Sequence, residues 1–295
     1  MPATHRPFRE SSGRSAITTG TNTSLTHQLS ATEMPYALTS LPTYSWPAAS
    51  PHALSVAPAS AFSPQAAIAI ARAVTATAFL GTAEKDFYRV AAQWNGRGPF
   101  DVLIADVRPG GHLRCYVGQP QAEVGSVEQG IGPGLLTVSR QDPEGRLVQG
   151  SLPLASGRVD EDIEHYLRHS EQIPSRLRVF VKLGDTGLPV AVAGVLVQTL
   201  PGGAAEALLE QGGALAPDFF ERSLSPEQSL DSLLAQVFCA QPVEVLSEES
   251  IDFRCQCSLE RVERGVAMLG PDELLAVGDF VLVIDEAHRK LGQVA

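Results

Sequence analysis

Short apolar segments separated by turn sequences fill the middle of this 295-residue chain and constrain its fold most. Val90, Ala92 and Trp94 alternate with polar or small residues, a two-residue period that is typical of a β-strand. The turn sequence Asn-Gly-Arg-Gly-Pro follows at residues 95–99, and a second apolar strand is expected over residues 100–107. A strand, a tight turn and a returning strand together predict antiparallel pairing.

The same pattern continues to residue 200, with further turn sequences at residues 109–111, 142–145 and 184–187. Strands are expected over residues 112–117, 135–139, 147–152, 176–183 and 190–200. Hairpins therefore outnumber strand–helix–strand units. We expect an α+β fold with a largely antiparallel sheet and packed helices.

Two helices are predicted within this sheet-rich region. Ser63 and Pro64 fit the N-cap and first position of an alanine-rich helix over residues 66–79, which ends at Gly81. A second, polar helix is expected over residues 160–170. Its inward-facing side chains should be Ile163, Tyr166 and Leu167.

Composition divides the chain into four parts. Residues 1–60 are rich in Thr, Ser, Ala and Pro, and their closely spaced prolines predict a disordered N-terminal extension with neither helix nor strand. A transit peptide and an upstream start, with Met34 as the true first residue, are alternatives. Residues 61–201 form the predicted α+β core, residues 202–250 a helical linker, and residues 251–295 a small C-terminal domain.

An apolar stripe marks the predicted linker. Ser225, Pro226 and Gln228 fit a capping box with proline at the first helical position. Apolar residues then follow at positions i, i+3, i+4 and i+7, which share one helix face. This linker stripe consists of Leu230, Leu233, Leu234 and Val237, and Phe238 adds bulk beside it.

Charge and missing motifs exclude several classes of function. The 22 basic and 33 acidic residues give a net charge of −11, which is unsuited to a nucleic-acid or anionic membrane surface. No uninterrupted apolar run approaches the length of a transmembrane helix. Nucleophile-elbow, P-loop and H-E-x-x-H sequences are absent, so we expect no enzyme and no nucleotide cofactor. A metal hydrolase or a thiol enzyme would rest only on isolated His and Cys residues.

Two further motifs have a functional and a structural interpretation. Gly-Ile-Gly-Pro-Gly at residues 130–134 resembles a phosphate-cradling loop, although Pro133 lacks an N–H donor and no helix follows; a flexible sheet connection is the alternative. His165 and His169 are spaced to chelate a metal as a pair. No third ligand is evident, and a solvated helix face is the alternative.

Four cysteines are too few for a disulfide-stapled secreted scaffold and favour a reducing, cytoplasmic location. They are Cys115, Cys239, Cys255 and Cys257. The last two form a C-x-C motif before a predicted helix, where they could hold Zn²⁺, although a closed zinc site needs four ligands. The pair is alternatively a redox-labile thiol pair, with the Cys257 thiolate favoured by the helix N-terminus, or two inert thiols.

Five stretches taken together are specific. They are N-G-R-G-P at residues 95–99, H-L-R-C-Y-V at 112–117, Y-L-R-H-S-E-Q-I-P at 166–174, V-Q-T-L-P-G at 197–202 and F-R-C-Q-C-S-L-E-R-V at 253–262. They resemble the 33-kilodalton heat shock protein family, the redox-regulated bacterial holdase chaperones. The similarity is collinear from about residue 65 to about residue 280.

This resemblance implies an α+β core, a helical linker and a C-terminal domain in which C-x-C and C-x-x-C share one Zn²⁺. In that family, oxidation releases zinc, unfolds the small domain and loosens the linker, and the exposed apolar surface then captures unfolding proteins without ATP. The resemblance therefore assigns metal and redox roles to Cys255 and Cys257. It assigns client contacts to the linker stripe and Phe238.

The sequence also departs from the family pattern. Ile284 and Ala287 stand where the second cysteine pair is expected, while a one-residue slip would offer Asp285 and His288 as zinc ligands instead. The first sixty residues do not resemble the N-terminal strand and helix of the family. We therefore expect zinc to be lost and the redox switch to be degraded or rewired.

Two functional hypotheses follow. The first is an ATP-independent holdase-type chaperone that binds unfolded proteins. The second is a non-chaperone paralogue that uses the same surface to bind one specific protein, and saturable one-to-one binding to a folded protein would favour it. Neither involves nucleic acid or a membrane, and a homodimer remains open.

Overall fold

The computed structural model describes residues 24–30, 36–44, 62–82, 87–199 and 245–253, together with the single residues Arg264 and Met268. The helices in these ranges are α1 (Pro64–Thr82), α2 (Val127–Ile131) and α3 (Val159–His169). The strands are β1 (Ser24–Ser30), β2 (Tyr36–Tyr44), β3 (Arg89–Gly96), β4 (Val102–Arg108), β5 (His112–Val117), β6 (Gly134–Gln141), β7 (Leu147–Pro153), β8 (Ser175–Leu183), β9 (Pro189–Thr199) and β10 (Val245–Phe253).

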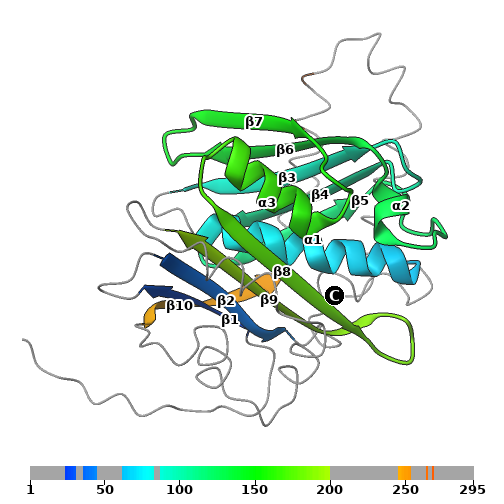
Figure 1. Ribbon diagram of the computed structural model, residues 1–295, viewed down its shortest axis with the longest axis horizontal. Coiled ribbons are helices and arrows are strands. Elements are labelled where there is room, and N and C mark those ends of the chain that lie inside the picture. Colours follow the sequence, from blue (N-terminus) through cyan, green and yellow to red (C-terminus); the bar gives the residue numbers. More distant parts are fainter. Residues whose placement is uncertain are drawn as a thin grey trace, which may run out of the picture.

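The strands form one sheet in the order β7-β6-β3-β4-β5-β10-β1-β2-β9-β8. We call β7 to β5 in this order the first half-sheet and β10 to β8 the second half-sheet (Figure 1). All neighbours pair antiparallel except β5 and β10, which are parallel and join the halves where Phe253 pairs with Leu113. The predicted α+β fold with a largely antiparallel sheet is confirmed.

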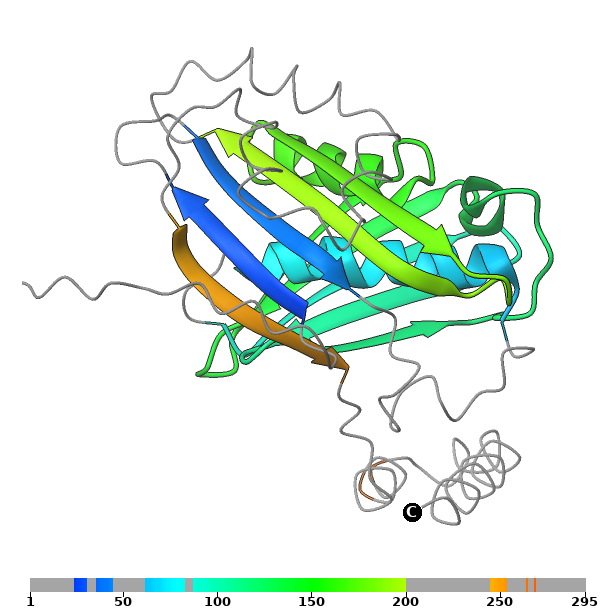
Figure 2. The same cartoon turned by 90° about the horizontal axis from the view of Figure 1, so that it is seen from below.

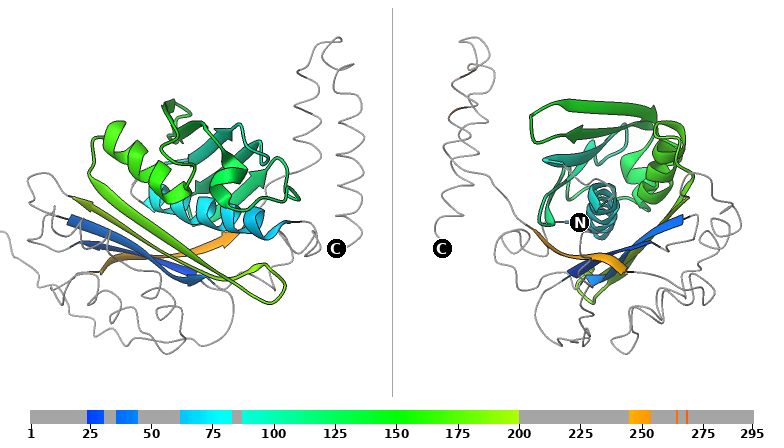
Figure 3. Two further views of the ribbon diagram at one scale, coloured as in Figure 1. Left: turned by 45° about the vertical axis from the view of Figure 1, so that its right-hand side comes forward. Right: turned by 90° about the vertical axis from the view of Figure 1, so that its left-hand side faces the viewer.

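Helix α1 lies between the two half-sheets (Figures 1 and 3). Ala69, Ala73 and Ala76 are fully buried, and their small side chains allow both half-sheets to approach the helix closely. The hydroxyl of Ser63 accepts the backbone N–H of Ala66 at 3.2 Å, which confirms the predicted N-cap. By length and by its mean hydropathy of 1.2, α1 would suffice for a membrane span, but 72% of that stretch is buried, as in the core helix of a globular protein.

The first half-sheet presents one face to α1 and the other outward. Val90, Ala92 and Trp94 are buried on the α1 face, as their alternation predicted. Helix α3 packs against α1 and β8, and its Ile163, Tyr166 and Leu167 are buried as expected. Figure 2 shows the strands of the second half-sheet side by side beneath α1.

The N-terminal region differs from its prediction. Two strands, β1 and β2, lie within residues 1–60, for which the prolines had predicted neither helix nor strand. Pro35 precedes β2, and Pro42 lies where the register between β2 and β9 shifts, so neither proline interrupts a regular ladder.

The predicted linker also differs at its C-terminal end. Strand β10 occupies residues 245–250, which were assigned to the helical linker, and continues into the predicted C-terminal domain. Its antiparallel partner is β1, near the other end of the chain. The sequence indicates a strand over residues 251–254, but a partner so distant in sequence cannot be identified from local residues. The remaining linker residues, 202–244, lie outside the described ranges.

Candidate functional site

The residues assigned to sites from the sequence lie mostly outside the described ranges. Cys255 and Cys257 follow Phe253, the last residue of β10, and the linker stripe and Phe238 belong to the undescribed stretch after β9. Their metal, redox and client-binding roles therefore stay predictions. The same holds for Ile284, Asp285, Ala287 and His288.

An apolar row on β9 is the clearest candidate surface among the described residues. A Cβ on Gly194 would come within 2.8 Å of the Phe79 ring and 2.9 Å of Thr75, so Gly194 faces α1. Side chains alternate along a strand, and the odd-numbered residues of β9 therefore face away from α1. They are Ala191, Ala193, Val195 and Val197, all buried, and we call them the outer row.

The sequence carries a signal for this row that the strand prediction left unused. Residues 190–197 are continuously apolar, which is typical of a strand covered on both faces. The core around α1 takes Val192 and Leu196 from β9 but no member of the outer row. The outer row is thus a second apolar surface of the same strand.

Basic residues of β8 border the outer row. Arg176 pairs with Val197, Arg178 with Val195, and Lys182 with Ala191. Cross-strand partners share one face of a sheet. An apolar strip with a basic border can contact apolar segments and attract acidic ones.

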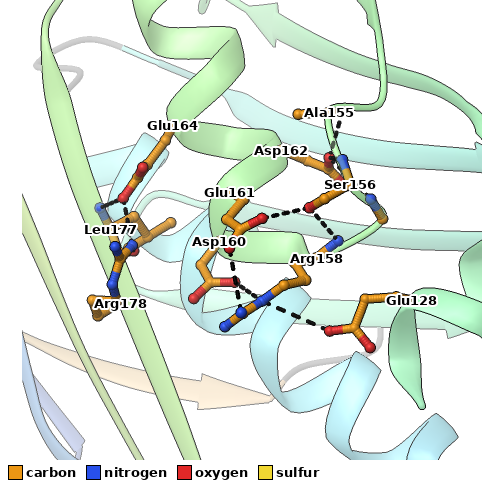
Figure 4. Close-up of polar contacts among 11 residues, drawn as sticks. Glu128, Ala155, Ser156, Arg158, Asp160, Glu161, Asp162, Glu164, Leu177 and Arg178 are labelled. Carbon is orange, nitrogen blue, oxygen red and sulfur yellow. Dashed lines mark hydrogen bonds and ion pairs between the residues drawn. The ribbon is translucent and has the colours of Figure 1, made fainter. Parts of the chain in front are cut away.

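Glu164 of α3 holds two of these basic residues, Arg176 and Arg178, at the sheet edge. Figure 4 shows its contacts with Arg178 and Leu177. Its Oε1 accepts the backbone N–H of Leu177 at 2.6 Å and a guanidinium N–H of Arg178 at 2.7 Å. Its Oε2 accepts an N–H of Arg176 at 3.2 Å. Because β8 is the outermost strand among the described residues, Glu164 both caps an edge donor and fixes the basic border.

A second carboxylate fixes the loop between β7 and α3 (Figure 4). Oδ1 of Asp162 accepts the backbone N–H groups of Ala155, Ser156 and Gly157 at 2.8, 3.1 and 3.3 Å. Burial raises the pKa of the Asp162 carboxyl above its ordinary value, although these hydrogen bonds act in the opposite direction. Asp162 also lies in the first turn of α3, where a negative charge suits the helix dipole.

The acidic side chains around α3 serve as ion-pair partners. The Arg158 guanidinium lies 3.3 Å from Glu161, 3.7 Å from Glu128 and 3.8 Å from the buried Asp160. Within the described residues, no group of three or more His, Cys, Asp or Glu side chains could hold a metal ion. This charged cluster therefore has a structural role.

Cys115 faces the core and differs from a redox-active thiol. Cys115 of β5 pairs with Ala105 of the neighbouring strand β4 and packs against the buried cluster around α1. Burial, with a smaller contribution from the negative charge of Asp106, raises the pKa of the Cys115 thiol to about 12. Since the thiolate is the reactive species, this raised pKa disfavours reaction of Cys115 at neutral pH.

The two weaker motifs have structural roles. Gly130 and Ile131 end the short helix α2, and the N–H groups of Gly130 and Gly132 donate to the carbonyls of Ser126 and Glu128. Those donors are not free to bind a phosphate. The expectation of a flexible connection was also wrong, because the N–H groups of the 95–101 turn donate back to this segment.

His165 and His169 lie side by side on α3, with no further candidate metal ligand beside them among the described residues. The His165 and His169 rings lie 4.1 Å apart on α3, and a ring nitrogen of His169 lies 2.9 Å from the His165 carbonyl oxygen. Partial burial, with smaller contributions from His169 and Arg168, lowers the pKa of His165. The described residues supply no third ligand.

Comparisons with known proteins agree on one family. The family model described as "Hsp33 protein" matches residues 54–279. A "33 kDa chaperonin" of Thermus thermophilus is 34% identical over 231 residues, which cover 72% of this chain and 67% of that protein. The "33 kDa chaperonin" of Desulfotalea psychrophila is 32% identical over 226 residues, covering 72% and 76%.

A solved structure shows the same fold. The crystal structure of the 33 kDa chaperonin from Thermotoga maritima superposes with a TM-score of 0.70 and covers 86% of this chain and 88% of that one. The identity between the two is 22%, so this likeness concerns the fold.

Proposed function

Because the chain belongs to the Hsp33 family, we propose that it is an ATP-independent holdase-type molecular chaperone that binds unfolded proteins. The observation that carries this function is the family match over residues 54–279, which includes the core around α1 and the predicted linker. Such a chaperone needs apolar surface and no catalytic group, so we propose no enzymatic activity, and neither nucleic acid nor a membrane as partner.

Client contacts are proposed at two apolar surfaces. The linker stripe with Phe238 would be adhesive once it is released from the core. The outer row of β9 is a second such surface, buried as described and bordered by Arg176 and Arg178. Uncovering the outer row would expose a continuous apolar strip suited to unfolding chains.

Zinc does not fit the residues present well. Cys255 and Cys257 supply two thiolates, whereas a closed structural zinc site has four ligands and the second cysteine pair is missing. No step of the proposed function therefore runs through zinc. We propose that these two thiols act at most as a residual oxidation sensor in a cytoplasmic protein, as a monomer or a homodimer.

A light-scattering assay tests the chaperone function. The full-length protein is added to an enzyme that unfolds and aggregates on heating, under reducing conditions and after peroxide treatment. We expect suppressed scattering in at least one condition. Absence of suppression in both would reject the function, and saturable one-to-one binding to a folded protein alone would favour the paralogue.

Metal analysis tests the sensor. Protein purified under reducing conditions should hold far less than one zinc per chain if the site is lost. If the protein instead holds one zinc per chain and Cys257→Ser loses it, the result would support a zinc-based switch.

A further inference from the structure

The two edges of the ten-stranded sheet are treated differently. At one edge, β8 carries Arg176, Arg178 and Lys182, and Glu164 caps the outward N–H of Leu177. Charges and capped donors on an edge strand discourage pairing with another chain. At the other edge, β7 has the sequence Leu-Val-Gln-Gly-Ser-Leu-Pro and contains no charged residue.

The hydrogen-bond register shows which backbone groups of β7 point outward. At the two ends of the β6–β7 ladder, Asp142 N–H donates to the Arg146 carbonyl and Leu154 N–H to the Gly134 carbonyl. Hydrogen-bonded and non-hydrogen-bonded pairs alternate along an antiparallel ladder. The residues of β7 that bond to β6 are therefore Val148, Gly150 and Leu152. Those that direct N–H and C=O groups away from β6 are Leu147, Gln149 and Ser151.

The outward edge of β7 is accessible and firmly held. Leu147 and Val148 are 62% and 70% exposed, and Gln149 and Ser151 are exposed as well. On the inner face, a Cβ on Gly150 would meet Ser170 and Tyr166 of α3 within about 3 Å, so α3 supports the strand from behind. Among the described residues, β6 is the only strand that pairs with β7. The edge is thus a preformed template for one more strand.

We propose that the β7 edge binds extended segments of unfolded proteins by adding them to the sheet as a further strand. This proposal rests on the proposed chaperone function and names a binding mode for its clients. Main-chain pairing suits such partners, because it recognises an unsatisfied extended backbone rather than a particular sequence. The uncharged strand, with Leu147 and Val148 exposed, favours segments of uncharged, alternating apolar residues.

A peptide pair tests the proposal on the full-length protein. The first peptide alternates valine and threonine between terminal lysines, and the second has the same sequence with N-methyl groups on alternate residues, which remove the pairing donors of one edge. Reduced protein should bind the first peptide about tenfold more tightly than the second, since two or three main-chain hydrogen bonds are lost.

A substitution locates the site. Gln149→Pro removes one outward N–H without touching the ladder to β6, and the loss of this one hydrogen bond should lower affinity for the first peptide by about threefold or more. Gln149→Thr keeps the N–H and serves as the matched control, with wild-type affinity expected. Thermal melts establish whether both variants fold. If Gln149→Pro does not fold, the methylated peptide still tests the proposal on the wild-type protein.

Three results would overturn the proposal. One is equal binding of the two peptides, and another is unchanged binding by folded Gln149→Pro. The third is a wild-type protein that is a dimer and becomes a monomer in Gln149→Pro. That result would mean that a second copy of this chain, and not an unfolded client, occupies the β7 edge. Suppressed aggregation by the wild-type protein in these cases would leave the chaperone function standing without the edge site.

Discussion

Buried carboxylates in this protein anchor backbone rather than perform chemistry. Glu164 binds the edge N–H of Leu177 and two arginines, and Asp162 binds three N–H groups of the loop before α3. On the outer face of the first half-sheet, Asp106 is paired with Arg114 and, at 3.0 Å, with Arg89. The arginines beside Glu164 and Asp106 offset those two buried charges, whereas Asp162 has only backbone N–H donors and keeps a raised pKa.

The raised pKa of Asp162 predicts a pH dependence of stability. Its carboxyl titrates above the unfolded value of 3.8, so the native state takes up a proton before the unfolded state as the pH falls. Linkage then makes the contribution of Asp162 to stability increase from neutral pH down to about pH 4. Asp162→Asn keeps an acceptor for the three N–H groups but cannot titrate. Urea unfolding should show the free energy of unfolding of the wild type increasing relative to that of Asp162→Asn as the pH falls. A constant difference or the opposite trend would contradict a raised pKa for Asp162.

Cys115 should resist alkylation in the folded protein. Its thiol pKa of about 12 leaves almost no thiolate at neutral pH, and the side chain packs into the core. Brief treatment with iodoacetamide followed by peptide mass spectrometry should find Cys115 unmodified in native protein and modified in urea. Labelling of native Cys115 at the rate seen in urea would show that this thiol is available for redox chemistry.

At the scale of elements, two turns lock into each other. The N–H groups of Gly98 and Phe100 donate to the carbonyls of Ile131 and Gly130 at 2.9 and 2.8 Å, so the Asn-Gly-Arg-Gly-Pro turn packs directly on the end of α2. A Cβ on Gly98 would lie 2.3 Å from the Gly130 carbonyl oxygen. Glycine at this position is therefore required by close backbone approach.

Gly98→Ala should lower the free energy of unfolding by about 2–3 kcal/mol, because the backbone atoms it meets cannot rotate aside. Gly125→Ala is the matched control, since its Cβ would meet only the side-chain end of Gln129, at 2.8 Å. Urea titrations of both variants measure the effect. An equal loss of unfolding free energy in Gly98→Ala and Gly125→Ala would mean that the turn at residues 95–99 can move to accept a side chain.

Elements with clear periodicity, capping or turn residues were predictable, and elements without them were not. Helix α1 follows from its Ser63 cap, helix α3 from its apolar periodicity, and the hairpins from their turn residues. Strands β1 and β2 pair with each other as a hairpin, but the prolines around them had predicted neither helix nor strand. Strand β10 pairs with the distant β1, and its residues 245–250 had been assigned to the helical linker. Helix α2 was missed despite a capping-box pattern at Ser126 and Gln129, because its five residues include Gly130.

The candidate site followed the same division. The continuous apolar run of β9 was visible in the sequence, and it could have predicted the outer row. The contacts of Glu164 with Arg176 and Arg178 could not be predicted, because the arginines lie on β8 and only the fold brings this strand next to α3. The openness of the β7 edge likewise depends on strand order.

At the scale of the whole molecule, α1 couples the two half-sheets. It contacts β3, β4 and β5 on one side and β8 and β9 on the other. Among the described residues, the two halves pair strand to strand only at the short parallel pair of β5 and β10. The halves are therefore coupled through the buried alanine face of α1, together with α3, which packs against β8 and supports β7. Unfolding of the described core should then be a single cooperative transition.

Ala76→Leu tests this coupling. Ala76 is fully buried between the half-sheets, and the larger side chain has to push them apart, which should cost about 2–3 kcal/mol. Gln65→Leu, at a half-buried position near the start of α1, should change stability by less than about 0.5 kcal/mol. Urea unfolding followed by far-UV and near-UV circular dichroism should shift both signals together in Ala76→Leu. If the two signals separate in wild type or in the variant, the core does not unfold in a single cooperative transition and the proposed coupling through α1 is contradicted.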